Sequence, residues 1–413
     1  MRIVLVFLMF FCTEVFSQSW QVAGQMPVPV SGAQAIVHDS LIYILGGFSE
    51  AQNSNINLIQ EYNPKTDTWK VAGTMNSPRA DFIAGTYSDS IIYAGGISSE
   101  SPNSSSLETW DYTNSAFVTV NNEYFNRLYS TGKVIGNNIY VFGGSTKDST
   151  SPYMFVYNLP ENKITFSNDT LFAGAFPTLQ MSAVYNNYIY LFGGARDVLQ
   201  KSIYKFDISN NKITQLSIQM EHPRAGGTAV FLNNKIFILG GFDEYNKPLY
   251  STKYIRVYSG GESEMEDGPN LNFARRDPIA VNYYGNIYVF GGLGSDGLDV
   301  SSIEMFSDIS TTIVNDKSSA PLKFNLGNNY PNPFNPSTQI RFEVPKQSRI
   351  SVDIFSILGK HIKNLTSKIY DPGKYNITWD GTNLQGERVS SGIYIYRLSS
   401  IYFSESKKMI LLK

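Results

Sequence analysis

The chain of 413 residues contains few of the residues that metal, redox and nucleophilic sites require. Its single cysteine is Cys12, and its three histidines, His38, His222 and His361, lie far apart in the sequence. A single cysteine forms neither an internal disulfide nor a cysteine-based metal site. No histidine pair with metal-ligand spacing, no Gly-x-Ser-x-Gly motif and no phosphate-binding loop is present. The sequence therefore predicts no metal site, no cofactor and no recognisable set of catalytic residues.

Excess charge of one sign and long apolar runs are also missing. The formal net charge is −2 and the pI is about 6.0, with no block of Lys and Arg and no acidic tail. Basic patches capture nucleic acid and anionic membrane surfaces, so the charge pattern favours neither partner. Beyond the N-terminus, no segment approaches the ~18 continuous apolar residues that a membrane-spanning helix needs. We therefore expect no nucleic-acid partner and no transmembrane segment in the mature chain.

The N-terminus has the pattern of a secretory signal peptide. Arg2 supplies a positive charge, Ile3–Phe11 is an apolar run, and Ser17 ends a plausible cleavage site. A lipoprotein signal that uses Cys12 is the alternative, but the residue before the cysteine of such a signal is small, and Phe11 is large. We predict a signal peptide over residues 1–17, and therefore a mature chain without any thiol.

Aromatic residues are abundant, at 14% of the chain, with 27 Tyr and 26 Phe. Such residues favour the pleated surfaces of β-sheets. They occur within a repeat, because six short apolar runs each end in a glycine pair and the pairs lie 47 to 51 residues apart. Glycine has no Cβ and permits the close backbone approach and positive φ expected where such a strand ends. The pairs are Gly46 and Gly47, Gly95 and Gly96, Gly143 and Gly144, Gly193 and Gly194, Gly240 and Gly241, and Gly291 and Gly292.

Each repeat also contains a second hairpin. After the glycine pair comes a large residue, then a polar turn, then a second large residue seven positions later. The pairs are Tyr62/Trp69, Trp110/Phe117, Tyr157/Ile164, Phe206/Ile213 and Tyr258/Met265. One repeat is thus four short antiparallel strands, and residues 19–308 resemble the kelch repeat, whose units form the blades of a β-propeller. The resemblance implies a propeller with six blades.

The two ends of the repeat region predict how the ring closes. The segment that begins at Trp20 matches the one that begins at Trp69, so the chain starts with a single fourth strand. The last repeat has a third strand at 303–306 and no convincing fourth strand of its own. We predict that the N-terminal strand completes the sixth blade, because this leaves no open sheet edge between the first and last repeats. The predicted fold is all-β, with a six-bladed kelch-type propeller over residues 18–308.

A second module follows a predicted linker at residues 309–326. It spans residues 327–413 and opens with three prolines that alternate with turn formers, over Tyr330–Thr338. Alternation of apolar and polar residues then predicts strands and a small immunoglobulin-like β-sandwich. The expected strands are 339–344, 349–355, 375–379, 392–398 and 406–413.

This module resembles the type A C-terminal sorting domain of the type IX secretion system of gram-negative bacteria. The likeness rests on Tyr330–Thr338, on Trp379-Asp380-Gly381 with Ser391–Tyr394, and on Lys407–Leu411. The resemblance implies Sec-dependent export, handling by the type IX machinery, and a final place in the medium or on the cell surface. The alternative is an ordinary sandwich domain without a sorting role.

The loops after the second and fourth strands of each repeat share one face, and the resemblance to kelch-like proteins implies a ligand site on that face. The residue sixteen positions before each first glycine, here called the entry residue, is arginine in four of six repeats. Arginine suits carboxylates and sugar hydroxyls. The predicted ligand-binding residues are Arg79, Arg127, Arg224 and Arg275, with Phe48 and Phe242 after two of the glycine pairs. The alternative is that the repeated arginines tie neighbouring blades together.

Binding of a protein or glycan ligand is therefore the first functional hypothesis, and catalysis is less favoured. Copper oxidases of kelch type need a crosslinked cysteine, which the mature chain lacks. The alternative is a carbohydrate-active enzyme similar to the sialic-acid (N-acetylneuraminate) epimerases, which needs an acid/base pair at the mouth. Candidates for that pair are Asp81, His222, Asp277, Asp243 and Glu244. A cluster of histidine, carboxylate and arginine at the mouth would favour the enzyme, and arginine with aromatics alone would favour binding.

Overall fold

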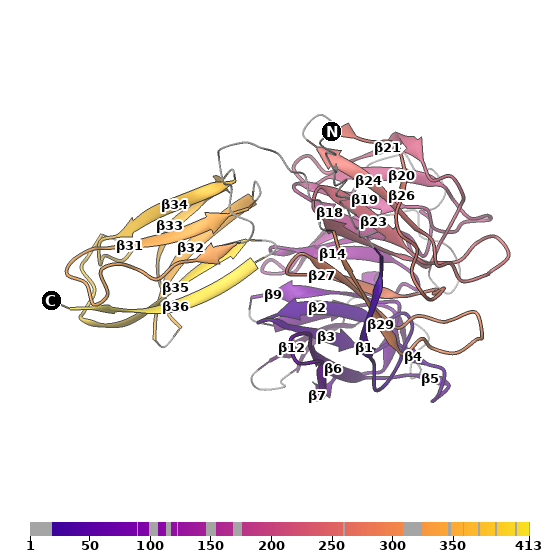
Figure 1. Ribbon diagram of the computed structural model, residues 1–413, viewed down its shortest axis with the longest axis horizontal. Coiled ribbons are helices and arrows are strands. Elements are labelled where there is room, and N and C mark those ends of the chain that lie inside the picture. Colours follow the sequence, from indigo (N-terminus) through magenta and orange to yellow (C-terminus); the bar gives the residue numbers. More distant parts are fainter. Residues whose placement is uncertain are drawn as a thin grey trace, which may run out of the picture. The chain divides into compact units, whose positions relative to one another are not determined.

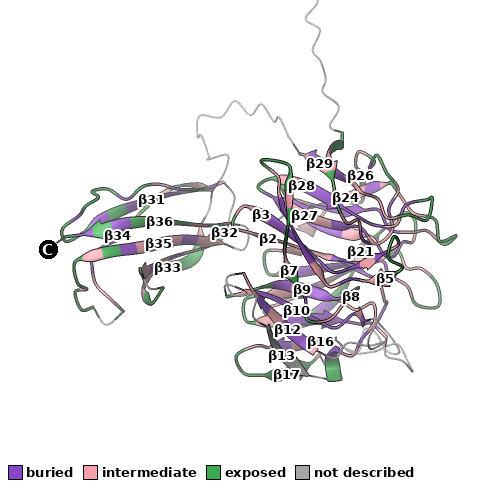
Figure 2. Cartoon of the chain, turned by 90° about the horizontal axis from the view of Figure 1, so that it is seen from below, coloured by how far each residue is buried: buried purple, intermediate pink, exposed green. Residues whose placement is uncertain are grey.

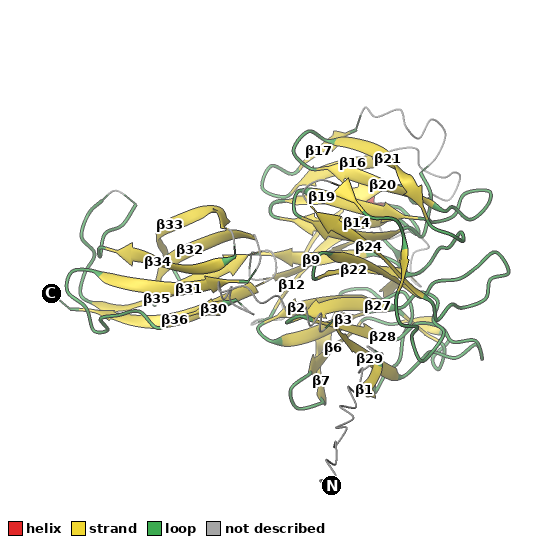
Figure 3. Ribbon diagram, turned by 45° about the horizontal axis from the view of Figure 1, so that its top comes forward, coloured by secondary structure: helices red, strands yellow, loops and turns green. Residues whose placement is uncertain are grey.

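The computed structural model describes residues 19–412, except 89, 99–105, 113–116, 122, 146–153, 168–175, 259–260, 309–323, 346–347, 358, 371, 385 and 401–402; at 117–121 only the backbone is described. The predicted signal peptide and Cys12 lie outside the described residues. The chain divides into two compact units, Met1–Ser310 and Thr311–Lys413. Strands make up most of both units (Figure 3).

The first unit contains six antiparallel sheets of four or five strands among its described residues, and in five of them the strands are consecutive along the chain apart from short connecting strands (Figure 1). Sheet 1 contains β2 (Gln34–His38), β3 (Leu41–Leu45), β6 (Leu58–Asn63) and β7 (Thr68–Thr74). Sheet 2 contains β9 (Ile83–Tyr87), β10 (Ser90–Ala94), β12 (Ser106–Asp111) and β13 (Phe117–Asn121). Sheet 3 contains β14 (Thr131–Ile135), β15 (Asn138–Phe142), β16 (Met154–Asn158) and β17 (Lys163–Phe166).

The remaining three sheets repeat this order with two variations. Sheet 4 contains β18 (Met181–Tyr185), β19 (Tyr188–Phe192), β20 (Ser202–Asp207) and β21 (Lys212–Gln219). Sheet 5 contains β22 (Thr228–Leu232), β23 (Lys235–Leu239) and β24 (Thr252–Tyr258), with β25 (Gly261–Glu262) and β26 (Glu266–Asp267) in place of one fourth strand. Sheet 6 contains β27 (Ile279–Tyr283), β28 (Asn286–Phe290), β29 (Ser302–Ser307) and β1 (Gln21–Gln25). Short elements in the connections are β4 (Phe48–Ser49), β5 (Ser54–Asn55), β8 (Arg79–Ala80), β11 (Ile97–Ser98) and the 3-10 turn η1 (Glu123–Phe125).

The N-terminal strand pairs with the last repeat, as the sequence predicted. Strand β1 runs antiparallel to β29, with Gln21 opposite Met305. Trp20 is buried, donates from Nε1 to the Pro269 carbonyl at 2.8 Å, and packs on Phe306 with ring centroids 5.2 Å apart. The inner strands of successive sheets are neighbours, and β27 lies against β2. These contacts confirm the all-β, six-bladed kelch-type fold, in which β1 is the fourth strand of sheet 6.

The glycine pairs lie where neighbouring sheets approach most closely. Both residues of each of the six pairs have positive φ. A Cβ on Gly291 would lie 2.0 Å from the Val30 carbonyl oxygen, which explains why this position requires glycine. The second glycine of a pair donates to the entry residue of the next sheet, as Gly47 N does to Arg79 O at 2.9 Å and Gly292 N to Val30 O at 2.9 Å.

Buried residues lie mainly along the strands and exposed ones mainly at the loops (Figure 2). Four of the five predicted hairpin pairs are opposite each other: Tyr62 with Trp69, Trp110 with Phe117, Tyr157 with Ile164, and Phe206 with Ile213. The prediction for Tyr258 and Met265 is wrong, because Tyr258 pairs with Gly261. Met265 lies instead between β25 and β26.

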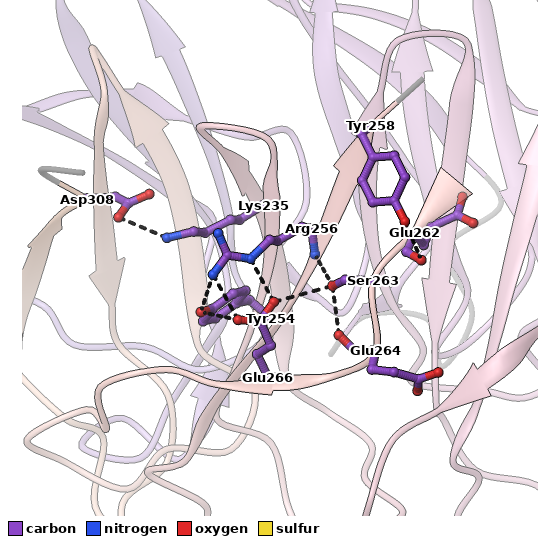
Figure 4. A network of polar contacts seen from close by, with 9 residues as sticks. All are labelled: Lys235, Tyr254, Arg256, Tyr258, Glu262, Ser263, Glu264, Glu266 and Asp308. Carbon is purple, nitrogen blue, oxygen red and sulfur yellow. Dashed lines mark hydrogen bonds and ion pairs between the residues drawn. The ribbon is translucent and has the colours of Figure 1, made fainter. Parts of the chain in front are cut away.

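A polar network replaces the regular fourth strand of sheet 5 (Figure 4). Glu266 accepts from the Nε of Arg256 at 2.7 Å and from the Tyr254 hydroxyl at 2.8 Å. Nearby, the hydroxyl of Ser263 donates to the Glu264 carbonyl at 2.8 Å. Glu262 extends away from this network and accepts from the Tyr190 hydroxyl of sheet 4 at 2.6 Å. The irregular strand thus also contacts the neighbouring sheet.

The second unit is a two-sheet sandwich. One sheet contains β30 (Asn325–Leu326), β31 (Thr338–Val344) and β34 (Gly373–Trp379). The other contains β33 (His361–Tyr370), β32 (Ser348–Ser356), β35 (Gly392–Ser400) and β36 (Phe403–Leu411). Trp379 and Tyr396 are fully buried between the sheets, and Phe334 packs on Trp379. The sheet of β30, β31 and β34 begins at β30, which lies inside the predicted linker. The long strand β33 was not predicted from the sequence.

Candidate ligand-binding site

The first unit has a central cavity of about 190 Å³ lined by residues at the beginning of all six inner strands. The innermost position in each sheet lies two residues after the entry residue, and its six occupants are called the ring residues here. Each has a left-handed backbone, with φ between 50° and 62°. The ring residues are Gly32, Asp81, Tyr129, Leu179, Gly226 and Asp277.

Backbone hydrogen bonds join neighbouring ring residues. Asp81 N donates to Gly32 O at 2.8 Å, and Gly32 N donates to Asp277 O at 3.0 Å. Asp277 N donates to Gly226 O at 2.6 Å, and Leu179 N donates to Tyr129 O at 3.0 Å. This chain of amides fixes the positions of the side chains that the ring residues present at the cavity, since buried backbone polar groups are strongly held once paired.

Both aspartates of the ring depend on a glycine in the preceding sheet. A Cβ on Gly32 would lie 2.7 Å from Oδ1 of Asp81, and a Cβ on Gly226 would lie 2.4 Å from Oδ1 of Asp277. Each carboxylate therefore occupies space that a larger ring residue would fill. The absence of a side chain at Gly32 and Gly226 is what allows the two carboxylates to lie at the cavity.

The two carboxyl groups are electrostatically coupled. Burial, together with the charge of Asp277, raises the pKa of Asp81 to about 8, although Arg276 opposes the shift. Burial also raises the pKa of Asp277, and Arg276 Nε opposes this from 3.2 Å. Burial and these two carboxylates raise the pKa of the Tyr129 phenol. Placing two carboxylates in one poorly solvated site favours the protonated form of at least one of them.

Arg276 connects the ring to the surrounding loops. Its Nη1 donates to Oδ1 of Asn246 at 2.8 Å, and its guanidinium lies 4.6 Å from the centroid of the Phe242 ring. Its side chain is a quarter exposed. The arrangement is an arginine held between a carboxylate and an aromatic ring at the edge of the cavity, with donors still facing solvent.

The four arginines predicted to bind a ligand are buried between the strands instead. Each donates from Nη1 to the carbonyl of the first glycine in its own sheet, at 2.7 to 3.2 Å: Arg79 to Gly95, Arg127 to Gly143, Arg224 to Gly240, and Arg275 to Gly291. Arg79 also forms an ion pair with buried Glu108, and Arg275 with buried Glu304 at 3.0 Å.

These contacts give the repeated arginines a structural role. The carbonyl of Arg79 accepts from sheet 1, through Gly47, while its side chain binds Gly95 in sheet 2. The carbonyl of Arg275 likewise accepts from Gly241 in sheet 5. A side chain that is almost fully buried and already paired is poorly placed to meet a ligand from solvent. We therefore correct the ligand-binding assignment of the four arginines to the alternative, in which they tie neighbouring blades.

The other predicted site residues are divided between the mouth and the surface. Phe242 lies at the mouth, where it packs over Gly226 and under Arg276. Phe48 is half-buried and its backbone bridges to Ser31. Of the acid/base candidates, only Asp81 and Asp277 line the cavity.

The remaining acid/base candidates lie outside the cavity. His222 is exposed and lies 3.5 Å from the carboxylate of Glu221. Asp243 accepts from the backbone amides of Tyr245 and Lys247 within its own turn, and Glu244 is exposed. The cluster of histidine, carboxylate and arginine that would favour the enzyme alternative does not form among the described residues.

Two cavity residues were missed from the sequence. Lys133 lines the wall, and burial lowers its pKa to about 8. Gln180 is 6% exposed and donates from Nε2 to Gly193 O at 3.3 Å, the contact that arginine makes in other sheets. Its Oε1 is buried and has no hydrogen-bond partner among the described residues. The entry residue of this sheet is Pro177, which cannot make the side-chain contact that arginine makes in four other sheets. This proline is the one sequence signal that a different side chain must donate to the glycine carbonyl.

Large apolar side chains are exposed on loops of the same face. Val198, Tyr245 and Leu298 follow the glycine pairs of sheets 4, 5 and 6 and are 69%, 74% and 61% exposed. Beside Leu298 lies a second hollow of about 570 Å³, whose lining includes Phe273 and Asp299. The face therefore combines a polar centre with apolar loop tips.

Among the described residues, no group of three His, Cys, Asp or Glu side chains is arranged to hold a metal ion. No helix in this part of the chain is long and apolar enough to cross a membrane.

Comparison with known proteins identifies both units. Two family models match the first unit, the KLHDC2/KLHL20/DRC7 Kelch-repeats domain over residues 104–241 and the Kelch motif over residues 29–76. A third model, the Secretion system C-terminal sorting domain, matches residues 328–412.

Relatives are similar to part of this chain. The chain is similar to Kelch-like protein 15 of Homo sapiens, with 24% identity over 248 residues that cover 54% of this chain and 40% of the relative. It is similar to Kelch repeat and BTB domain-containing protein 1 of cowpox virus, with 29% identity over 124 residues, or 29% of this chain and 22% of the relative. Kelch-like protein 41a of Danio rerio is 31% identical over 101 residues, or 24% of this chain and 16% of the relative. The matches thus span less than half of each relative.

Proposed function

We propose that this chain, which contains kelch repeats and a secretion system C-terminal sorting domain, is an exported propeller that binds a protein or glycan ligand on the face around its central cavity. The observation that carries the proposal is the position of Val198, Tyr245 and Leu298, which are exposed on three successive loops around a polar centre. Exposed apolar residues grouped on one face and surrounded by polar ones are typical of recognition surfaces.

A protein ligand is favoured over a glycan by the composition of this face. Tyrosine and leucine at loop tips bury large apolar areas when a partner docks, and tyrosine is enriched at the energetic centres of interfaces. Tyr245 and Tyr250 project from one loop, and Phe273 lies beside the neighbouring hollow. Glycan binding is the second outcome that the experiment below distinguishes.

Export through the type IX machinery is the second part of the proposal. The sorting-domain match over residues 328–412 supports it, and the predicted signal peptide supplies the first step. In the native host, removal of residues 327–413 is expected to leave the propeller in the periplasm. Finding the truncated protein outside the cell at the normal level would contradict this route.

Site-specific photo-crosslinking tests the binding face. A photoreactive phenylalanine analogue replaces Tyr245, and in a matched control it replaces Tyr284, which is 52% exposed in the β27–β28 turn on the opposite face. In secreted full-length protein at the cell surface, we expect discrete crosslinks from position 245 and none from 284. Equal crosslinking from both positions would refute the face. A glycan array probed with the same protein separates a glycan ligand from a protein ligand.

The alternative of a carbohydrate-active enzyme has one observation in its favour. Asp81 and Asp277 share the cavity, and the pKa of each is raised. Acid–base catalysis uses such a pair. The predicted histidine partner is missing from the pair, because His222 is exposed elsewhere. Turnover of N-acylated sugars by the wild-type chain but not by Asp81→Asn would favour this second function.

A further inference from the structure

We propose that the amine of Lys133, inside the central cavity of the first unit, forms an imine with small hydroxylated aldehydes. This inference goes beyond the proposed docking function, because it assigns a reactive site to the cavity whatever partner docks around it. The cavity of about 190 Å³ has room for a compound of a few carbon atoms. Lys133 is the one lysine among the residues that line it.

The first support is the place of Lys133 in the repeat. The residue lies four positions after the ring residue of its sheet, Tyr129, and it is the one of the six equivalent residues that lines the cavity. In the other five sheets the lining ends one residue earlier, at an alanine or a serine. The long side chain of Lys133 therefore extends into space that the other sheets leave open. A residue that departs from a repeated pattern is a candidate for function, because the packing of the repeat does not require it. The five equivalent residues are Ile36, Gly85, Ala183, Val230 and Val281.

The second support is the absence of opposite charge around the amine. Strands β9, β15 and β18 pack against β14, which carries Lys133. These three strands are described throughout and contain neither a carboxylate nor a second cation. Tyr140 lies directly opposite Lys133 in the pairing of β14 with β15. The titratable groups on the three strands are Tyr87, Tyr140 and Tyr185.

The amine is accordingly left without an acceptor. No described residue accepts a hydrogen bond from Nζ of Lys133 or forms an ion pair with it. Asp81 and Asp277 lie at the level of the ring, four residues or ~13 Å earlier along the inner strands at ~3.3 Å per residue. Burial lowers the pKa of Lys133 to about 8, and no carboxylate opposes the shift. The side chain still keeps part of its surface open to the cavity, so the neutral amine is an accessible nucleophile.

Hydroxyl groups beside the amine favour a hydroxylated aldehyde. Thr131 lies two residues before Lys133 and hence on the same face of β14. Its Oγ1 lies 2.9 Å from Oγ of Ser182 in the neighbouring sheet, and both residues line the cavity. Each hydroxyl both donates and accepts hydrogen bonds, which suits the hydroxyl group of such an aldehyde.

The reaction needs only the amine and the aldehyde. The neutral nitrogen attacks the carbonyl carbon, the π electrons pass to the carbonyl oxygen, and one proton moves from nitrogen to that oxygen. The resulting hydroxyl group then leaves with the second nitrogen proton as water, while the C=N bond forms. One amine and one aldehyde thus give one imine and one water, and no oxidant or reductant takes part.

Reductive trapping on the full-length chain tests the site. The protein is incubated at pH 7 with glycolaldehyde and sodium cyanoborohydride, which reduces each imine to a stable secondary amine. Mass spectrometry of the peptides follows the modification of Lys133 over time, with the exposed Lys65 and Lys247 of the same molecule as internal controls. The same measurement in urea that unfolds the protein shows the reactivity that the local sequence alone confers. Lys133→Met is the matched variant, and it is expected to fold because other sheets have isoleucine or valine at this position.

We expect Lys133 in the folded chain to be modified at least tenfold faster than Lys65 and Lys247. At pH 7 an amine of pKa about 8 is neutral ~300-fold more often than one of the ordinary pKa of 10.5, and narrower access reduces that factor. The ratio of the two rates is expected to fall between pH 7 and pH 10, because the exposed amines become neutral only at the higher pH. In urea the ratio is expected to fall to about one, and Lys133→Met is expected to lose the fast modification.

Modification of Lys133 no faster than that of the exposed lysines would overturn the inference, as would a ratio that is the same in the folded and unfolded chain or independent of pH. Propanal tests the hydroxylated class, because it has a methyl group where glycolaldehyde has its hydroxyl. Relative to the exposed lysines, propanal is expected to modify Lys133 at least threefold more slowly, and equal rates would overturn that class. If Lys133→Met fails to fold, the site-specific rates in the unaltered chain decide alone.

Discussion

The contrast between two adjacent arginines, Arg275 and Arg276, gives the sharpest mutational prediction. Arg275 is fully buried and donates to Gly291 O at 2.7 Å, Ser302 O at 2.6 Å and Glu304 Oε1 at 3.0 Å. Arg275→Met removes these bonds and leaves the buried carboxylate of Glu304 without its cation. Breaking such a pair costs about 3–5 kcal/mol of the free energy of unfolding. The amides of Asn272 and Phe273, which still donate to Glu304, place the expected loss near the lower end.

Arg276→Met is the matched control. Its side chain is a quarter exposed, and Asp277, whose pKa burial already raises, can take up a proton when the guanidinium is removed. A loss of about 1 kcal/mol is therefore expected, smaller than for Arg275→Met. Urea unfolding of the full-length chain, followed by tryptophan fluorescence, measures both variants. Adding Glu304→Gln to Arg275→Met is expected to recover part of the loss, because it removes the unpaired charge. Equal stability of the two single variants would refute the role given to the buried arginines.

Three further predictions follow from the fold and the ring. Trp20→Ala is expected to lower the free energy of unfolding by about 3–5 kcal/mol, because removal of the large indole leaves a cavity between sheets 5 and 6. Calorimetric melting measures the effect, and an unchanged Tm would contradict it. Gly226→Ala is expected to lower the free energy of unfolding by more than Gly136→Ala, although φ is positive at both positions. A Cβ at 226 would lie 2.4 Å from Asp277, whereas nothing lies within 4 Å of a Cβ at 136, so Gly136→Ala costs only the backbone strain of about 1 kcal/mol. Equal losses of stability in the two variants would contradict the packing at Gly226. Burial raises the pKa of Asp299 to about 6 from an unfolded value of 3.8, so its contribution to stability is complete below pH 3.8 and is lost as the pH rises to about 6. Because the carboxyl group is partly exposed, solvent screening reduces the effect, and Asp299→Asn is expected to flatten this part of the stability profile by on the order of 2 kcal/mol. An unchanged profile would contradict the burial of that carboxylate.

The sequence predicted the blades well because each blade needs glycine at one fixed point. Both glycines of every pair have positive φ, which favours glycine at that point of each sheet, so the number of glycine pairs in the sequence gives the number of repeats. The match between Trp20 and Trp69 was equally informative, since β1 occupies in sheet 6 the place that β7 occupies in sheet 1. Local turn geometry was harder to predict. The predicted pairing of Tyr258 with Met265 is wrong, because Tyr258 pairs with Gly261 at the start of β25.

The candidate site was less predictable because repetition and exposure are different properties. The repeat pattern identified the arginines in the sequence. Their side chains are buried and donate to glycine carbonyls, as Arg275 does to Gly291, so their role is structural. The ring residues are non-repetitive, so no pattern linked Tyr129 with Asp81 before the sheets were placed around one cavity. In the second unit, β33 was missed because all its residues are half-buried or exposed and its pairing with β32 contains two bulges, so no regular alternation marks it.

Disulfide trapping of the ring closure tests the central claim most directly. The double variant Gln21→Cys/Met305→Cys places thiols on residues that lie opposite each other in β1 and β29. The predicted mature chain has no other cysteine. We predict near-complete crosslinking on mild oxidation, detected by mass spectrometry of the linked peptides. The shifted pair Gln21→Cys/Ser302→Cys should stay reduced, because disulfides need Cα atoms within about 7 Å. Crosslinking of the shifted pair, or none in the aligned pair, would show that the first strand does not complete the sixth blade.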